Sequence, residues 1–249
     1  MGLIGTNIIV GLSSLLFGYL LGSFPTGVFI GKVFFGKDPR DYGSHNTGGT
    51  NTGRVLGKKI GVLTILIDAL KAAIAIYVVW AILSFTGLNQ YMVWENGYNA
   101  APVYYWGAGL AAAIGHCHSI FLKFKGGKAV ACEVGTVVML SWLELVLCII
   151  SFFTTLKTTK YVSISSIVMS IVATITLWVL AIIRLTTGFD VMLFSWGFSA
   201  NAANGVGLPI LGFEAAVCVT IITAMLIVRH RDNFRRLKEG TESKISWMK

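Results

Sequence analysis

The sequence predicts an all-α membrane protein, a polytopic bundle of transmembrane helices. Hydrophobic residues make up 55% of its 249 residues and charged residues only 12%, and the mean hydropathy is +0.75. Apolar runs such as residues 60–69, 72–83 and 164–183 are typical of bilayer spans, which need about 20 apolar residues each. These observations exclude a soluble globular protein.

The predicted spans follow one another along the chain. They cover approximately residues 8–30, 60–85, 102–121, 129–156, 162–183 and 206–228. The first span is softly interrupted near Gly22–Pro25. The stretch 129–156 would be about 42 Å long as one helix, which exceeds the roughly 30 Å of a bilayer core. It therefore contains either one strongly tilted span or two short spans that meet near Ser141–Trp142.

The distribution of Lys and Arg decides between these possibilities. Basic residues gather in three polar segments: 38–59, 123–128 and 229–249. The loops 86–101 and 186–205 contain none. Two short spans within 129–156 place all three basic segments on one face of the membrane, and the positive-inside rule makes that face cytoplasmic. We therefore predict seven spans in a single integral membrane domain over residues 1–249, with the N-terminus outside and the C-terminus in the cytoplasm.

The first polar segment, Asp38–Lys59, has the composition of an anion-binding loop. It is rich in Gly, Ser, Thr and Asn and includes Arg40 and Arg54. Small residues let backbone N–H groups approach an anion, while hydroxyls, amides and arginines add donors and charge. Phosphate is the ligand that this mixture favours. The alternative is a solvated turn with basic membrane flanks.

The other two basic segments allow similar alternatives. Lys125–Lys128 precedes an apolar helix, whose N-terminus favours an anion, although the spacing is not that of a Walker A loop; it could also be a basic turn at the membrane surface. His230 and Asn233 follow the last span. His230 is a candidate base or phosphate donor, and a polybasic lipid anchor is the alternative. His116 and His118, at the inner end of the third span, are equally ambiguous.

Inside the spans, Asp68 and Lys71 have the i,i+3 spacing of an ion pair on one helical face. Charged groups at this depth need a partner or a cavity, so the pair either holds the structure or faces a substrate. No Cys/His spacing or carboxylate cluster predicts a metal, and we expect no cofactor. The net charge of +9 is explained by the positive-inside rule and anionic lipids rather than by nucleic acid.

Together these segments resemble the three motifs of a known family, the PlsY-type acyl-phosphate:glycerol-3-phosphate acyltransferases. The first motif is carried by Gly43, Ser44, Asn46, Gly48, Thr50, Asn51 and Arg54. The second is carried by Gly115, His116, Phe121, Phe124–Lys128, Val130 and Ala131. The third is carried by His230, Arg231, Asn233, Arg236, Leu237 and Gly240–Glu242. Asp68, Lys71 and Tyr161–Ser163 also fit, so the resemblance covers most of the chain in order.

The resemblance implies a seven-helix enzyme of the bacterial cell (inner or plasma) membrane, with its active site facing the cytoplasm. It would transfer an acyl group from acyl phosphate to the 1-hydroxyl of sn-glycerol 3-phosphate, giving lysophosphatidic acid and phosphate, the first acylation step of phospholipid synthesis. Its partners would be the two substrates, membrane lipids and, as a candidate, an acyltransferase that produces acyl phosphate. No nucleic acid partner is implied.

The resemblance also implies roles for single residues. Catalytic residues would be Ser44, Arg54, His230 and Asn233. Residues that bind substrate or phosphate would be Asn46, Gly48, Thr50, Asn51, Lys125, Gly126, Gly127, Lys128 and Ser163. Supporting residues would be Asp68, Lys71, His116 and Glu242. Because phosphate is a good leaving group, positioning and charge stabilisation would suffice for direct attack without an acyl-enzyme. The hydroxyl proton would go to His230 or to the substrate phosphate.

The chain departs from the family pattern at several positions. His45 and Ala129 stand where the family usually has glycine, and His118-Ser119 replaces the usual Phe-Pro. Thr47 and Cys132 replace the usual Ile and Thr. The rival functions are an organophosphate transporter, a metal-dependent transferase acting on a nucleotide-linked alcohol, and a non-catalytic protein that binds anionic lipids. A transporter usually shows internal repeats, and a metal-dependent transferase needs an aspartate cluster; the sequence contains neither.

Overall fold

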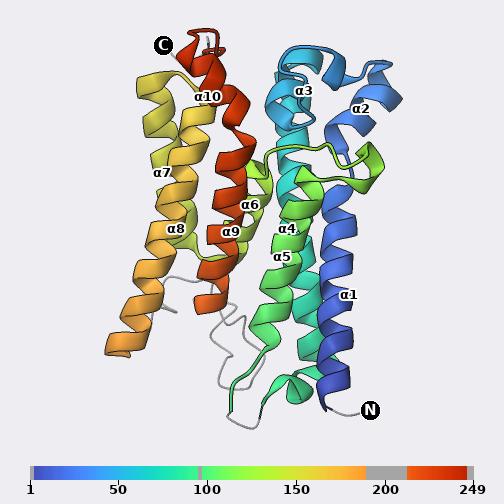
Figure 1. Ribbon diagram of the computed structural model, residues 1–249, viewed down its shortest axis with the longest axis vertical. Coiled ribbons are helices and arrows are strands. Elements are labelled where there is room, and N and C mark those ends of the chain that lie inside the picture. The colour runs from blue at the N-terminus through green and yellow to red at the C-terminus, as the bar shows by residue number, and fades with distance from the viewer. Residues whose placement is uncertain (1–2, 95–96, 189–211, 246–249) are drawn as a thin grey trace. The chain divides into compact units, whose positions relative to one another are not determined.

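A computed structural model describes the chain outside residues 1–2, 95–96, 189–211 and 246–249. Within the described residues the secondary structure is helical apart from turns and a single antiparallel bridge between Val93 and Asn99 (Figure 1). The all-α prediction is therefore confirmed. The chain divides into two compact units, Met1–Thr136 and Val137–Lys249, and the boundary between them falls within one helix, α6.

In its described residues the first unit contains three long helices and several short ones. In chain order these are α1 (Leu3–Ser23), α2 (Thr26–Phe35), η1 (Pro39–Asp41), α3 (Gly49–Leu56), α4 (Lys58–Phe85), η2 (Leu88–Met92), α5 (Ala101–Cys117), η3 (Ile120–Leu122) and the first part of α6 (Val130–Leu140). Helix α5 packs along both α1 and α4. Its contact with α1 is very close, since a Cβ atom on Gly18 or Gly22 would lie 2.2 or 2.0 Å from a carbonyl oxygen of α5. Small residues allow this approach, as is common between membrane helices.

The interruption predicted in the first span is confirmed. Helix α1 ends at Ser23 and α2 begins at Thr26, so Phe24 and Pro25 lie between them. Proline has no backbone N–H and cannot continue the hydrogen-bond ladder of a helix. The break redirects the chain into α2 and then into the first polar segment.

That segment was predicted as a loop, but part of it is helical. Residues 49–56 form α3, and α4 begins at Lys58. The prediction missed α3 because glycine has poor helix propensity. Tertiary packing overrides that propensity here: a Cβ atom on Gly61 of α4 would lie 2.5 Å from the Gly53 Cα atom and 2.8 Å from the Gly49 carbonyl oxygen. The glycines therefore let α3 lie directly against α4.

Outside residues 189–211 and 246–249, the second unit contains the end of α6 and four further helices. These are α7 (Trp142–Thr159), α8 (Val162–Thr187), α9 (Phe213–Arg229) and α10 (Arg231–Lys238). Helix α8 packs against α7 and α9, and its Trp178 Nε1 donates to the Thr220 hydroxyl at 2.9 Å. The predicted break near Ser141 is confirmed, because α6 ends at Leu140 and the Ser141 hydroxyl caps α7 by accepting from two backbone N–H groups.

Four stretches of described helix are long and apolar enough to span a membrane: Ile4–Phe35, Lys58–Phe85, Trp142–Thr159 and Val162–Thr187. The pair α9 and α10, bent by 45°, would make a fifth. Helices α5 and α6 are shorter, with 17 and 11 residues. The loop predicted at 186–205 and the predicted start of the last span at 206 lie largely outside the described residues; α8 continues to Thr187, and α9 begins at Phe213.

Candidate active site

The first polar segment is organised around the buried amide of Asn51. Its nitrogen lies within hydrogen-bond distance of the carbonyl oxygens of Pro39, Tyr42 and Asn46, at 2.7, 3.1 and 2.9 Å. Its oxygen accepts from the backbone N–H of Ser44 at 2.8 Å. Both ends of this side chain are therefore engaged by the loop itself. Asn51 fixes the path of the loop and the place of Ser44, whereas the sequence had suggested that it contacts substrate.

Two arginines in this segment differ in their availability. Arg40 forms a two-point contact with the Asp38 carboxylate, with Nη2–Oδ2 at 2.6 Å and Nε–Oδ1 at 3.0 Å. The hydrogen bonds from Arg40 hold the pKa of Asp38 well below its usual value. Arg54 is exposed on α3, and it forms no ion pair with any residue that the structure describes. Thr50, four residues earlier on the same helical face, is also exposed.

The start of α3 is shaped by Asn46 and Gly48. Gly48 is the N-cap residue, and its backbone N–H donates to the side-chain oxygen of Asn46 at 2.9 Å. The backbone N–H groups of the first turn of a helix lack partners within that helix and favour an anion. Thr50 lies in this first turn, so the segment presents backbone donors, a hydroxyl and a cation on one short helix.

The second motif forms a tight glycine turn against the end of α5. The Gly127 N–H donates to the His116 carbonyl at 2.9 Å. A Cβ atom on Gly126 would lie 2.1 Å from that carbonyl oxygen, and one on Gly127 would lie 2.0 Å from His116 Nε2. The predicted turn that leads into a helix is confirmed, since α6 begins at Val130. Lys125 is exposed beside the turn and Lys128 is half-buried.

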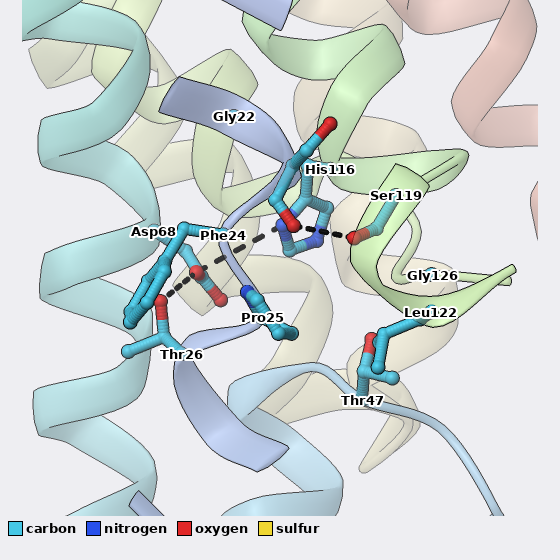
Figure 2. A pocket seen from close by; sticks show the side chains of 11 residues that line it. Gly22, Phe24, Pro25, Thr26, Thr47, Asp68, His116, Ser119, Leu122 and Gly126 are labelled. Atoms are coloured by element: carbon cyan, nitrogen blue, oxygen red, sulfur yellow. Dashed lines mark hydrogen bonds and ion pairs between the residues drawn. The ribbon is translucent and has the colours of Figure 1, made fainter. Parts of the chain in front are cut away.

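A small cavity lies where the break between α1 and α2 meets α4, the end of α5 and the glycine turn (Figure 2). Its lining includes Asp68, His116 and Ser23. The Lys71 ammonium donates to Asp68 Oδ1 at 2.6 Å, so the ion pair predicted from the spacing is present. The Ser23 hydroxyl is buried and has no hydrogen-bond partner among the described residues. The cavity has room for about one water molecule, which would satisfy that hydroxyl.

In the second unit, His230 lies at the bend between α9 and α10 and is only 3% exposed. Its Nδ1 atom is 2.8 Å from the Leu226 carbonyl oxygen. A carbonyl only accepts hydrogen bonds, so this contact assigns the proton of a neutral ring to Nδ1. The lone pair then lies on Nε2, the nitrogen that can take up a proton.

The Glu242 carboxylate collects the other predicted residues of this unit. Its Oε1 atom accepts from the Ser163 hydroxyl at 3.0 Å and the Asn233 amide at 2.7 Å, and its Oε2 accepts from Arg236 Nε at 2.7 Å. Burial raises the pKa of Glu242, but these hydrogen bonds lower it further than burial raises it, so the net pKa lies below its usual value. The Ser163 hydroxyl, which the sequence suggested as a substrate donor, is thus directed at Glu242.

The sequence model of the family described as glycerol-3-phosphate acyltransferase matches residues 12–240. The chain belongs to the glycerol-3-phosphate acyltransferase family. Two curated members are the glycerol-3-phosphate acyltransferase of Enterococcus faecalis, 37% identical over 94% of this chain and 91% of that protein, and that of Streptococcus gordonii, 35% identical over 97% and 94%.

Solved structures agree with the family assignment. The chain is similar to crystal structures of PlsY, an integral membrane glycerol 3-phosphate acyltransferase, in its glycerol 3-phosphate form and its lysophosphatidic acid form. The first match has a TM-score of 0.71 and 29% identity over 95% of this chain and 96% of that one. The second has a TM-score of 0.69 and 28% identity, covering 95% of each. The chain is therefore an integral membrane member of the family.

The structure places the predicted residues of this family member in two groups. The first motif, the glycine turn, Asp68, Lys71 and His116 belong to the first unit, and Ser163, His230, Asn233 and Glu242 belong to the second. In the first group Lys71 pairs with Asp68 and the glycine turn contacts His116, and in the second Ser163 and Asn233 both donate to Glu242. The meeting of all three motifs in one site stays a prediction.

Sequence reasoning missed Thr26 and Ser119. The Thr26 hydroxyl donates to Asp68 Oδ1 at 2.8 Å, and the Ser119 hydroxyl donates to the Ser23 carbonyl at the end of α1. The available signal was the position of Thr26 directly after Pro25, where a hydroxyl at a helix break faces unpaired backbone groups. For Ser119 no local pattern predicted a contact with a residue 96 positions earlier in the chain.

Proposed function

We propose that this chain transfers an acyl group from acyl phosphate to the 1-hydroxyl of sn-glycerol 3-phosphate, giving lysophosphatidic acid and phosphate. The observation that carries the proposal is similarity along nearly the whole chain to PlsY, whose crystal structures include a glycerol 3-phosphate form and a lysophosphatidic acid form. The segments 38–59 and 123–128 support the proposal, because each contains exposed cations and leads into a helix N-terminus that favours phosphate.

Two subsites would share the phosphate groups. In the first motif, Ser44, Thr50 and Arg54 supply hydroxyl donors and a planar cation around the start of α3. In the second, Lys125 and Lys128 flank a glycine turn at the start of α6. Arg54 and Lys125 are the strongest candidates for direct contact with phosphate, since both are exposed and neither has an ion-pair partner among the described residues. Asn46, Gly48 and Asn51 shape the first subsite.

The reaction is a direct displacement at the acyl carbonyl carbon. The 1-hydroxyl oxygen of glycerol 3-phosphate forms a bond to that carbon, and the bond from the carbon to the phosphate oxygen breaks with its electron pair leaving on phosphate. Arg54 and the lysines of the glycine turn stabilise the charge that develops on the leaving group. His230 Nε2 receives the hydroxyl proton, because Nδ1 already donates to Leu226. Asn233 and Glu242 hold α10, which begins directly after His230.

The membrane placement belongs to the same proposal. We place α1 with α2, and each of α4, α5, α6, α7, α8 and α9, across the bacterial cell membrane, which gives seven spans. The N-terminus is outside, and the segments 38–59, 123–128 and 229–249 face the cytoplasm. Single cysteines at Lys160 and at Lys238, labelled in intact cells with a membrane-impermeant maleimide, should both be protected. Labelling of one but not the other would refute the seven-span arrangement.

The test of function uses the purified full chain in detergent. Palmitoyl phosphate and glycerol 3-phosphate should yield equimolar phosphate and lysophosphatidic acid. Arg54→Ala should lower kcat/KM by about 100-fold or more, since it removes a cation from a phosphate. Arg235→Ala is the matched control, an exposed arginine of α10 paired with Asp232, and it should behave like the wild-type protein.

Each rival function gives a different result in the same experiment. A transporter would move labelled glycerol 3-phosphate into vesicles without forming product. A metal-dependent transferase would lose its activity in EDTA. A non-catalytic lipid-binding protein would release no phosphate although the acyl phosphate stays intact. Replacing acyl phosphate by acyl-CoA or an acylated carrier protein tests the donor: product from either of these at a comparable rate would refute acyl phosphate as the preferred donor.

A further inference from the structure

The buried carboxylate of Asp68 occupies a central place in the first unit that the reaction does not explain. Asp68 is 2% exposed and lies in the middle of α4. Three groups from three different helices approach its Oδ1 atom: the Thr26 hydroxyl at 2.8 Å, the Lys71 ammonium at 2.6 Å and His116 Nδ1 at 3.8 Å. Figure 2 shows Thr26 and His116 on either side of this carboxylate. A charge at this depth is costly unless it is compensated in this way.

On one side, Asp68 holds the start of α2. Thr26, which donates to it, is 3% exposed and is the first residue of α2. The next residue, Gly27, lies against the first motif segment: a Cβ atom there would be 2.4 Å from the Thr52 hydroxyl oxygen and 2.6 Å from the Thr47 carbonyl oxygen. A shift of Thr26 away from Asp68 would therefore move the backbone that supports residues 47–52.

On the other side, Asp68 faces the residue that supports the glycine turn. His116 presents Nδ1 to Asp68 while its Nε2 edge is packed against Gly127. The carbonyl of the same histidine accepts from the Gly127 N–H at 2.9 Å. The glycine turn therefore rests on both the ring and the backbone of His116, and the ring presents Nδ1 to the carboxylate at 3.8 Å.

Lys71 neutralises the carboxylate and stabilises the helix break. Its ammonium donates to Asp68 and also to the carbonyl oxygen of Phe24, which the break between α1 and α2 leaves outside the helical ladder. The same carbonyl also accepts from the Thr26 backbone N–H at 3.1 Å, so two donors meet on it at the break. The ion pair thus fixes the break itself, from which α2 and the first motif follow.

We propose that Asp68 is a positioning residue that fixes the first motif segment and the glycine turn relative to each other, so that binding of glycerol 3-phosphate depends on it. The proposal rests on the proposed function only for the identity of the ligand. The alternative is that Asp68 belongs to a buried ion pair that stabilises the whole unit without coupling these two segments. The two differ in which segments loosen when each contact of Asp68 is removed.

Hydrogen exchange of the purified full chain distinguishes the positioning role from general stabilisation, and it does not depend on catalytic activity. Thr26→Val removes the hydroxyl but keeps the shape, and it should raise exchange about tenfold in residues 43–52 alone. His116→Gln lacks a group at the Nδ1 position and should raise exchange in residues 123–128 alone. Asp68→Asn should raise both. Thr64→Val is the matched control, one turn earlier on α4, where a buried hydroxyl donates to the Ile60 carbonyl; it should raise neither.

Steady-state kinetics give a second readout. Asp68→Asn should raise the KM for glycerol 3-phosphate about tenfold while changing kcat by less than about threefold. The proposal is overturned if Thr26→Val and His116→Gln loosen the same residues throughout the unit, or if the KM stays unchanged. If Asp68→Asn does not fold, the two milder variants decide. If the wild-type protein forms no product, the proposed function fails, but the exchange pattern still decides on the positioning role.

Discussion

Replacing His230 by Asn separates its chemical role from its structural one. Asn can place its side-chain nitrogen near the position of Nδ1 and keep the hydrogen bond to the Leu226 carbonyl, which is 2.8 Å long in the wild-type protein. It has no counterpart of Nε2, the proton-accepting nitrogen. His230→Ala removes both groups. The two variants therefore differ by one buried hydrogen bond, worth about 1 kcal/mol, at a site that is 3% exposed.

The expected magnitudes follow from these contacts. Loss of a general base lowers kcat by about 100-fold to 10,000-fold, which corresponds to about 3–5 kcal/mol of activation free energy. Both variants should show this loss. His230→Ala should in addition lower the free energy of unfolding by about 1 kcal/mol, because the Leu226 carbonyl at the end of α9 loses the hydrogen bond from the ring and keeps only the one from the His230 backbone N–H. His230→Asn should unfold like the wild-type protein.

The assay is phosphate release from palmitoyl phosphate at saturating glycerol 3-phosphate, with thermal unfolding of the same samples in detergent. Matching melting curves for His230→Asn and the wild-type protein show that the bend between α9 and α10 is kept. If this variant then retains more than about a tenth of the wild-type kcat, the reasoning is refuted. The hydroxyl proton would in that case go to the substrate phosphate, and His230 would serve to hold the bend.

Three further predictions concern backbone strain, packing and pH. Ala129 has φ +64°, so Ala129→Gly should raise the free energy of unfolding by up to about 1 kcal/mol. His45 has φ +56°, but His45→Gly should leave the stability nearly unchanged, because it also removes a hydrogen bond from Nδ1 to a backbone carbonyl. Thermal unfolding measures both effects. Gly127→Ala should raise the KM for glycerol 3-phosphate more than tenfold, because its Cβ atom would displace the ring of His116. Because the pKa of Glu242 is lowered in the folded protein, its carboxylate stabilises the fold above the unfolded-state pKa and loses this effect as the pH falls through the lowered pKa. Hydrogen exchange of α10 should therefore rise on acidification in the wild-type protein and not in Glu242→Gln.

The features that the sequence predicted well are those set by local chemistry. Pro25 cannot continue a helix, and the chain breaks there. The Ser141 hydroxyl caps α7, and the long apolar stretch divides at that residue. The pairing of Asp68 with Lys71 follows from the helical period alone. The helix break and the ion pair are decided by residues within four positions of one another, so no knowledge of tertiary packing was needed; the division at Ser141 was predicted from the length of the apolar stretch and the distribution of basic residues.

The features that the sequence did not predict depend on contacts between distant segments. The side chain of Asn51 has the chemistry of a phosphate donor, yet the loop engages both of its polar ends. The Ser163 hydroxyl could likewise donate to a substrate, yet it donates to Glu242, 79 positions later in the chain. A residue type shows which bonds a side chain can make. Only the fold decides whether a ligand or the protein itself takes them.

At the positions that depart from the family pattern, the backbone of this chain has the conformation that the family's usual residue would favour. Ser119, where the family usually has proline, has φ −64°, close to the value of about −65° that a proline ring imposes. Its hydroxyl also donates to the Ser23 carbonyl, so the second motif is tied to the end of α1 by a hydrogen bond that proline could not make. His45 and Ala129, where the family usually has glycine, keep the left-handed conformation that glycine adopts at no steric cost. The paths of the first two motifs are therefore set by their packing against α1, α4 and α5, and the local residue type adjusts only the energetic cost of following them.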